Sequence, residues 1–149
     1  MTKMNSVRSI MFWVPGRPAS KARPRVAVSV HRGRRIDSRV YTPEATKRSE
    51  DAFRAAAIAA RLEHKIEKPI SGSIYLNVWF VFTDKRAPGG GEKTGRPDID
   101  NLLKLVLDGI NGSGLWYDDA QVVRVVASKY VASIDKEQGT MVQVQEVSQ

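Results

Sequence analysis

The sequence predicts an α+β fold, in which a mixed β-sheet carries two main helices packed on one side. Three observations lead to this prediction. Several short segments have apolar residues at every second position, two longer segments have helical spacing, and the strands and helices are interleaved without an internal repeat. With 149 residues, 42% of them hydrophobic, the chain can bury a core and is expected to form a single domain over residues 1–149.

In the basic N-terminal region, residues 1–42, the sequence pattern predicts a strand that is followed by a basic hairpin or a long loop. Residues 9–14 form a short apolar segment that ends at a proline. In the basic segment that follows, Val26, Val28 and Val30 alternate with other residues before Gly33, a residue typical of turns. This pattern predicts a β-hairpin or a long loop.

The first helix is expected over residues 43–64. Thr42 is the predicted N-cap, and Pro43 takes the first helical position, where its missing N–H costs nothing. One face at helical spacing consists of small residues and one aromatic residue, and we expect it to be buried. Its members are Ala45, Ser49, Ala52, Phe53, Ala56 and Ala60.

The remaining elements follow from the same periodicities. Residues 73–82 are β-branched and aromatic without a breaker, which predicts a central strand. A glycine-rich, charged loop is expected at 83–95, and helical spacing resumes over 98–110. Residues 121–132 predict another strand, and 141–147 a final strand at an edge of the sheet.

The composition excludes several kinds of site. The chain has no cysteine, so it has neither a disulfide framework nor a thiolate zinc site. Only two histidines, His31 and His64, are available for a histidine-based metal site or a catalytic triad. No apolar run approaches the roughly 18 to 20 residues of a membrane span, and we expect a cytoplasmic protein of bacterial or phage type.

Positive charge is concentrated in the first third of the chain. Residues 1–54 hold 13 lysines and arginines against four acids, whereas residues 55–149 hold 11 against 12. This asymmetry indicates either a solvated basic face or a surface for a polyanion such as DNA. The stretch from Arg17 to Ile36 contains no acid, and its candidate DNA contacts are Arg17, Lys21, Arg23, Arg25, Arg34 and Arg35.

Acidic residues gather in a later segment. Asp98, Asp100, Asp108, Asp118 and Asp119 share 22 positions with one lysine, Lys104. Helix capping or pairing with Lys104 explains one or two of these carboxylates but not the later pair. The connection to Asp118 and Asp119 is long enough to run back along the helix toward Asp98 and Asp100.

A cluster of carboxylates without histidine or cysteine suits a hard divalent cation such as Mg²⁺ or Mn²⁺. In a basic protein, such a site indicates phosphodiester chemistry, in which Lys104 could contact the phosphate as charge develops on it. Two alternatives remain open. A non-catalytic DNA-binding protein would need no divalent ion, and a nucleotide-dependent transferase would use Asp-x-Asp to hold the metal of its substrate.

The acidic segment resembles the signature of the RusA family of Holliday-junction resolvases. The resemblance covers about 30 residues and joins two separated acidic elements with a lysine at fixed spacing. The matching residues are Asp98, Asp100, Asn101, Lys104, Asp108, Leu115, Trp116, Tyr117, Asp118, Asp119, Gln121 and Val122.

This resemblance implies a RusA-like fold and a Mg²⁺-dependent homodimeric endonuclease that cleaves four-way DNA junctions in recombination and repair. It implies that Asp98, Asp100 and Asp119 are catalytic acids that bind the metal. Lys104 would act at the phosphate, and Asp118 would be a supporting group or a further ligand. Trp116 and Tyr117 are interpreted as packing residues that orient the aspartate pair. The long basic N-terminal region and the loop at 83–95 are less typical, so another branched DNA is an alternative substrate.

Overall fold

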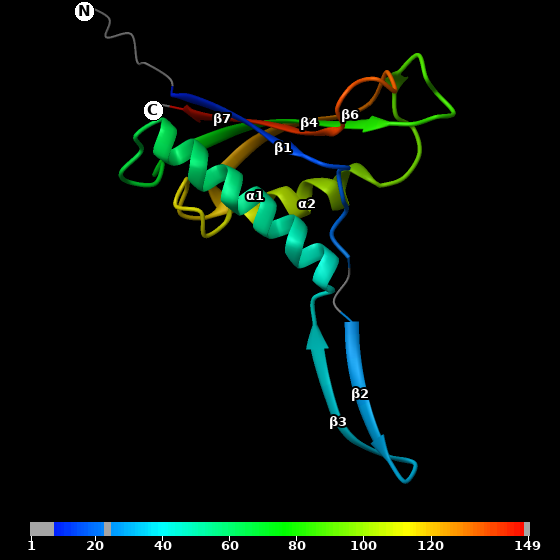
Figure 1. Cartoon of the computed structure of the whole chain (residues 1–149). Helices are drawn as coiled ribbons and strands as arrows, with labels where there is room; N and C mark the ends of the chain where they lie inside the picture. The colour runs from blue at the N-terminus through cyan, green and yellow to red at the C-terminus, as the bar shows by residue number, and fades with distance from the viewer. Residues whose placement is uncertain (1–7, 23–24, 148–149) are drawn as a thin grey trace, which may run out of the picture.

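The computed structural model describes residues 8–22 and 25–147, and it confirms the α+β fold class. A five-stranded sheet carries both α-helices on one of its faces, and a separate two-stranded hairpin extends from this body (Figure 1). The strands of the sheet lie in the order β1-β7-β4-β6-β5. Their bounds are β1 Ser9–Pro15, β4 Ser73–Thr83, β5 Gly91–Glu92, β6 Val122–Ala132 and β7 Gly139–Val147.

Strand β4 is central, as predicted. It pairs with β7 in antiparallel and with β6 in parallel orientation. Every second side chain of β4 is buried under the helices, namely Ile74, Leu76, Val78, Phe80 and Phe82. Because successive side chains of a strand point to opposite faces, the apolar alternation is what fixes this register.

The prediction that residues 141–147 form an edge strand is wrong. Strand β7 lies between β4 and β1, because β1 pairs with it along its whole length from Ser9↔Gln145 to Pro15↔Gly139. The inward side chains Thr140, Val142 and Val144 are accordingly buried. On this side of the sheet the edge strand is β1.

Helix α1, Glu44–Glu63, differs from the prediction in its start and in its buried face. Pro43 takes the cap position and no side chain caps the helix, so the assignment of Thr42 as N-cap is wrong. Phe53 and Ala60 are buried as expected, whereas Ala45 and Ala52 are exposed. The buried face runs instead through Thr46, Phe53, Ala57 and Ala60.

Helix α2, Ile99–Ile110, is the crossover between the parallel strands β4 and β6. The apolar face of α2 packs into the core through Leu102, Leu105, Val106 and Ile110. It crosses α1 closely at Gly109, where a Cβ atom would lie only 2.6 Å from Cβ of Phe53. The opposite face of α2 is therefore left to the polar residues of the acidic segment.

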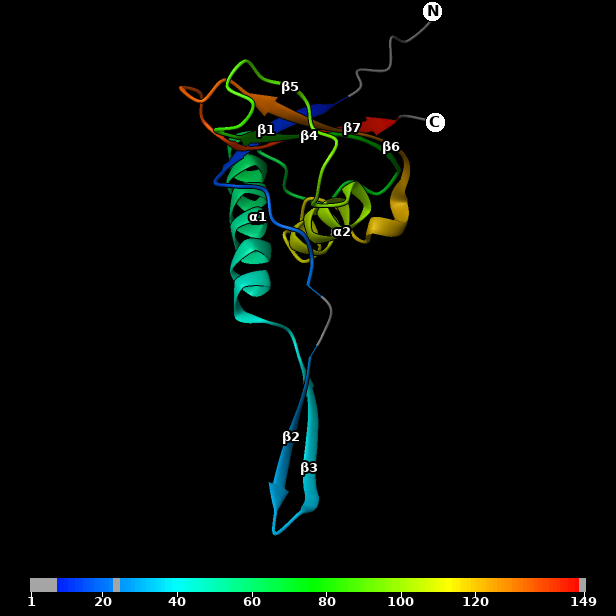
Figure 2. The ribbon, with the colours of Figure 1, turned by 90° about the vertical axis from the view of Figure 1, so that its right-hand side faces the viewer.

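Strands β2, Arg25–His31, and β3, Arg34–Tyr41, form the predicted basic hairpin. Figures 1 and 2 show this hairpin projecting away from the sheet and the helices. We call it the arm. No α-helix in the described part of the chain is long and apolar enough to cross a membrane.

Candidate active site along helix α2

The first acidic residues stand where the chain enters α2. Asp98 occupies the N-cap position with an extended backbone, but its side chain makes no capping hydrogen bond. Asp100 lies in the first helical turn, and both side chains are exposed. Within the described ranges neither forms an ion pair. Capping and pairing therefore do not explain these two carboxylates.

The segment that leads into Asp98 is held by Lys129 of β6. The Lys129 ammonium donates to the carbonyl of Gly95 and to that of Pro97, each at 2.8 Å. These are charge-assisted hydrogen bonds, the stronger kind in proteins. Lys129 thereby fixes the backbone on the N-terminal side of Asp98.

Lys104 lies in the middle of α2, one turn after Asp100 and one turn before Asp108. Its side chain is exposed, and among the described residues it forms no ion pair. The explanation of Lys104 as a salt-bridge partner of either aspartate is therefore not supported by the geometry. An ammonium without a carboxylate partner remains available on the polar face of α2.

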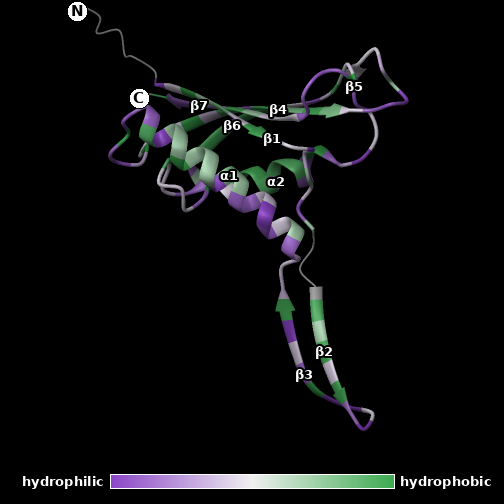
Figure 3. Cartoon of the chain, viewed as in Figure 1, coloured by the Kyte–Doolittle hydropathy of each residue, from purple (hydrophilic) through white to green (hydrophobic). Residues whose placement is uncertain are grey.

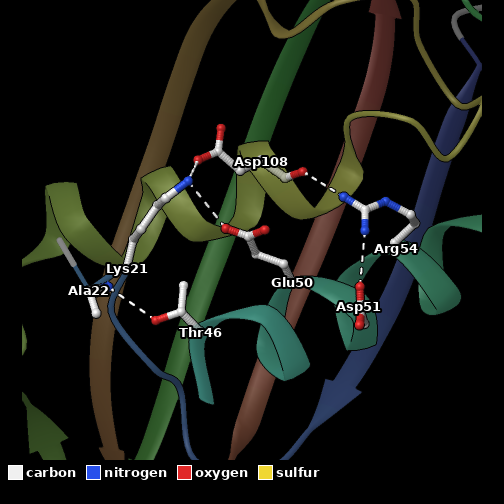
Figure 4. Close-up of polar contacts among 7 residues, drawn as sticks. All are labelled: Lys21, Ala22, Thr46, Glu50, Asp51, Arg54 and Asp108. Carbon is white, nitrogen blue, oxygen red and sulfur yellow. Dashed lines mark hydrogen bonds and ion pairs between the residues drawn. The ribbon is translucent and has the colours of Figure 1, made fainter. Parts of the chain in front are cut away.

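The partner of Asp108 is Lys21, which precedes the arm (Figure 4). The Lys21 ammonium binds the Asp108 carboxylate and lies 3.2 Å from Oε1 of Glu50 on α1. The hydrogen bond that the Lys21 ammonium donates to Asp108 is the main cause that raises the pKa of Lys21 above its ordinary value, with Glu50 adding to the rise and burial opposing it. Lys21 thus joins α1 to α2 from inside the fold.

The C-terminal end of α2 is held by Arg54 of α1. Its guanidinium donates to the carbonyl of Asn111 at 3.1 Å and to the backbone carbonyl of Asp108 at 3.2 Å, as well as to the Asp51 carboxylate (Figure 4). A cation at this end satisfies carbonyls that have no partner within the helix.

Asp118 and Asp119 lie at a short turn that follows α2 in the chain. Trp116 is buried and donates its indole N–H to Oδ1 of Asn111 at 2.7 Å. This bond orients the Asn111 amide, whose side chain is in turn a hydrogen-bonding neighbour of Asp119. The interpretation of Trp116 as a packing residue is confirmed, whereas Tyr117 is 65% exposed and that part of the interpretation is wrong.

Asp118 has a structural role of its own. Its carboxylate accepts from the N–H of Ala120 at 3.1 Å, and the Gln121 side chain accepts from the N–H of Asp118 at 2.9 Å. Together they form a capping box around the short 3₁₀ turn Asp119–Gln121. Gln121 also donates to the carbonyls of Ile70 and Gly72, and it thereby ties this turn to the segment before β4.

The two neighbouring carboxyl groups have opposite pKa shifts. The pKa of Asp118 lies below its ordinary value, mainly because the Ala120 N–H stabilises the charged form. The pKa of Asp119 is raised, first by its hydrogen bond with the Asp118 carboxylate and then by burial. The charge of Asp108 contributes to the same rise. Negative charge from Asp118 and Asp108 therefore converges on Asp119.

The structure places the predicted acids at two ends of one helix. Asp98 and Asp100 lie at its start, whereas Asp119 is a neighbour of Asn111 and Asp108 at its end. Asp98 and Asp108 are separated by roughly 15 Å along the helix axis. The connection therefore does not run back beside Asp98, and within residues 8–22 and 25–147 no three acidic or histidine side chains lie close enough to hold a metal.

Each end nevertheless suits a divalent cation in its chemistry. The donors are carboxylate oxygens in every case, and a cation would offset the negative charge that converges on Asp119. Mg²⁺ is commonly held by one or two carboxylates, with water and substrate phosphates as the other ligands. A pair of acids at either end is therefore a sufficient protein contribution.

The candidate DNA contacts that the structure describes lie after β1, before the arm and on the arm. Arg17 lies after β1, where it donates to the carbonyl of Thr83 and stacks on the Phe82 ring. Lys21 is committed to Asp108 and Glu50. Arg25 begins β2, and Arg34 and Arg35 are exposed on the arm. Arg23 lies outside the described residues.

Several residues that shape this site were not identified from the sequence. Lys129 and Arg54 act on backbone carbonyls far along the chain, and Asn111 accepts from Trp116 five positions later. No local pattern marks these three residues. Gln121 was identified only by family resemblance. Its local signal was present, because an acid followed by Gln three positions later is typical of a capping box.

Comparison with known proteins places the chain in a family. Residues 15–145 match the family described as endodeoxyribonuclease RusA, which includes the whole of α2 and the Asp118–Asp119 turn. The chain is also similar to an uncharacterized protein of Bacillus subtilis (strain 168), YqaN, with 28% identity over 151 residues that cover 93% of this chain and 97% of the relative. The chain therefore belongs to the RusA endodeoxyribonuclease family.

Proposed function

We propose that this protein is a Mg²⁺-dependent, structure-selective endonuclease that resolves Holliday junctions by hydrolysing DNA phosphodiester bonds in recombination and repair. Family membership supports the class of reaction. The observation that carries the proposal is the polar face of α2, where Asp98 and Asp100 neither cap nor pair and where Lys104 has no ion-pair partner in the described structure.

In this proposal, Asp98 and Asp100 hold a divalent ion at the start of α2, and Asp119 binds a second one at the other end of the helix. Mn²⁺ could substitute for Mg²⁺ in both places. When bound, the ion offsets the charge of the phosphate and favours deprotonation of the attacking water. The Lys104 ammonium binds the phosphate oxygens that gain charge in the transition state. Asp118 supports Asp119 through the capping box, and Lys129 keeps Asp98 in place.

The proposed substrate is a branched DNA with four arms, and the proposed active form is a homodimer. Two copies would present two such faces, one for each of the two strands that must be cut. The positive charge that is concentrated in the N-terminal region would bind the phosphates around the branch.

The direct test is incubation of the protein with an end-labelled synthetic four-way junction, with Mg²⁺ and with EDTA. We expect symmetrical cuts near the branch in Mg²⁺ and no cuts in EDTA. Asp100→Asn should abolish cleavage and retain binding, because it removes a charge and leaves the shape. The matched control is Asp135→Asn, the same change at an exposed acid in the β6–β7 connection.

Two outcomes would contradict the proposal. Mg²⁺-dependent cleavage by the Asp100→Asn protein would remove that residue from the site. Tight junction binding by the wild-type protein without any cut, in Mg²⁺ or in Mn²⁺, would instead identify a non-catalytic DNA-binding protein.

A further inference from the structure

One face of the arm is apolar and lies in solvent. The pairing of β2 with β3 puts Val26 opposite Val40, and Val28 and Val30 continue the same face at every second position. Their exposed fractions are 57%, 70%, 47% and 62%, respectively. Figure 3 shows strand β2 as mainly hydrophobic although it projects beyond the body. Nothing in the described structure covers this face.

Arginines lie on the other face and at the tip of the arm, and Arg35 lies opposite Val30 at the end of the apolar face. Arg39 pairs with Ala27, and Arg34 pairs with His31 beside the turn. Residues 25–41 contain five arginines and one aspartate, a net charge of +4 with the histidine neutral. The four arginines whose side chains the structure describes, Arg32, Arg34, Arg35 and Arg39, form no ion pair within the described residues. The arm is therefore an amphipathic ribbon with free cations.

The base of the arm is anchored next to the candidate active site. Before β2, the N–H of Lys21 donates to the carbonyl of Asn101 at 3.1 Å, one residue after Asp100. The N–H of Ala22 donates to Oγ1 of Thr46 on α1, and α1 itself follows β3. A molecule that contacts the arm is thus held close to the N-terminal end of α2.

An isolated two-stranded ribbon with an uncovered apolar face is only marginally stable in water. The arm therefore needs a partner that covers its apolar face, which we call the valine face, and that supplies negative charge to its arginines. Phosphates supply the counter-charges. The seven residues of β2 span about 23 Å, and a two-stranded ribbon of this kind fits the major groove.

We propose that the arm inserts into the open centre of branched DNA, with its valine face against unstacked bases and its arginines on the surrounding phosphates. This inference rests on the proposed function, because it assigns the recognition of the branch to a second element. In a continuous duplex the base faces are covered by stacking, and they are accessible only where stacking is interrupted. Apolar side chains are known to enter such interrupted steps. The arm thus makes binding selective for a branch rather than for DNA in general.

A second copy of the chain is the other conceivable occupant. Packing two arms against each other would cover the valines, but it would also bring two ribbons of charge +4 together without a counter-charge. DNA satisfies both faces at once. The charge balance therefore favours DNA.

The test replaces the valine face by an isosteric polar one in the triple variant Val26→Thr, Val28→Thr and Val30→Thr. Threonine keeps the shape and the strand preference of valine, so the ribbon is retained. Binding to a four-way junction and to a linear duplex is measured in Ca²⁺, where no cleavage is needed. We expect junction affinity to fall about tenfold or more, and duplex affinity to change less than about twofold.

A junction with 2-aminopurine at the branch reports the contact directly. The wild-type protein should increase its fluorescence by holding the base unstacked, and the triple variant should not. The matched control is Ala27→Ser, a polar change on the opposite face of the same strand. It should leave both the junction preference and the fluorescence change intact.

An unchanged junction preference in the triple variant would overturn the inference. So would a shift from dimer to monomer in light scattering without DNA, which would identify a second copy as the occupant. Since these measurements concern binding, their outcome is independent of whether the wild-type protein cuts junctions in Mg²⁺. Failure of the arm and failure of the proposed nuclease activity can therefore be told apart.

Discussion

At the scale of single residues, Lys104 distinguishes a chemical role from a structural one. If the lysine only balanced nearby aspartates, its loss would cost about 0.2–0.5 kcal/mol of stability and would not affect cleavage. The absence of an ion pair at Lys104 in the described structure argues against that role.

Lys104→Ala should therefore lower the single-turnover cleavage rate by at least about 100-fold, because it removes a cation from the developing charge on the phosphate. Junction affinity should fall far less. Lys104→Arg should still bind junctions but cleave them poorly, since a planar guanidinium replaces a compact ammonium. Lys47→Ala, at an exposed lysine of α1, is the control. Near-normal cleavage by Lys104→Ala with saturating enzyme would rule out the role at the phosphate.

Lys21 allows a prediction about stability and pH. Lys21→Met leaves Asp108 and Glu50 side by side without their cation, and it should lower the free energy of unfolding by about 1–2 kcal/mol at neutral pH. The folded-state pKa of Lys21 is raised, so its stabilising contribution is fully present below the ordinary lysine pKa. It is lost as the pH rises through the folded value.

Urea unfolding of the wild type and of Lys21→Met at increasing pH measures this difference. The two free energies should converge at alkaline pH above 10.5, the ordinary value for lysine. A gap between them that does not depend on pH would show that Lys21 stabilises the fold by packing alone.

At the scale of elements, α1 and α2 cross closely at Gly109. An added Cβ would meet Cβ of Phe53 at 2.6 Å and the carbonyl oxygen of Glu50 at 3.0 Å. Because part of this obstacle is backbone, the helices must move apart. Gly109→Ala should therefore destabilise the protein by about 1–3 kcal/mol, measured as a loss in the free energy of unfolding.

The control for this change is Gly89→Ala in the loop after β4, where a Cβ would meet no atom within 4 Å. Since α2 carries the candidate site, Gly109→Ala should also reduce cleavage more than its stability loss implies. Equal stability of the two variants would contradict the close packing of the helices.

The residue pattern predicted the helices and strands themselves better than it predicted which of them lie side by side. Strand β4 was predicted from its β-branched and aromatic residues, and the hairpin of the arm, with a long loop as the alternative, from the alternation of valines, because these patterns lie within a few residues. The position of β7 in the sheet was not predicted, because it depends on pairing with β1 near the other end of the chain, as in Ser9↔Gln145. No local pattern of β7 reveals that partner.

The candidate site shows the same limit. The motif identified Asp98, Asp100, Lys104 and Asp119, but it did not show which of them lie together. That depends on Arg54, which holds the end of α2, and on Gln121, which ties the Asp118–Asp119 turn to the segment before β4. Both contacts join distant segments, and so the placement of Asp119 at the far end of the helix became evident only from the structure.

At the scale of the whole molecule, the distribution of charge predicts the salt dependence of DNA binding. Neutral replacement of Arg34 and Arg35 by Gln should reduce the slope of log affinity against log salt by up to about 2, because each phosphate contact contributes roughly 0.9. Fluorescence titration with a junction over a range of NaCl concentrations measures the slope. Replacing Arg124, which stacks on Tyr75 of the main sheet, is the control. An unchanged slope would show that the arm does not contact phosphates.

The pairing of β1 with β7 also bears on how the chain folds during synthesis. Arg8 and Glu146, which form an ion pair at the end of these strands, are 138 positions apart. Strand β1 leaves the ribosome early, yet its partner exists only after residues 139–147 have been made. Since contacts between distant segments form slowly, the nascent chain carries an unpaired apolar strand for most of its synthesis. Pulse-labelled chains that stop before Gly139 should accordingly bind chaperones and be cleaved readily by proteases, whereas the released full-length chain should not.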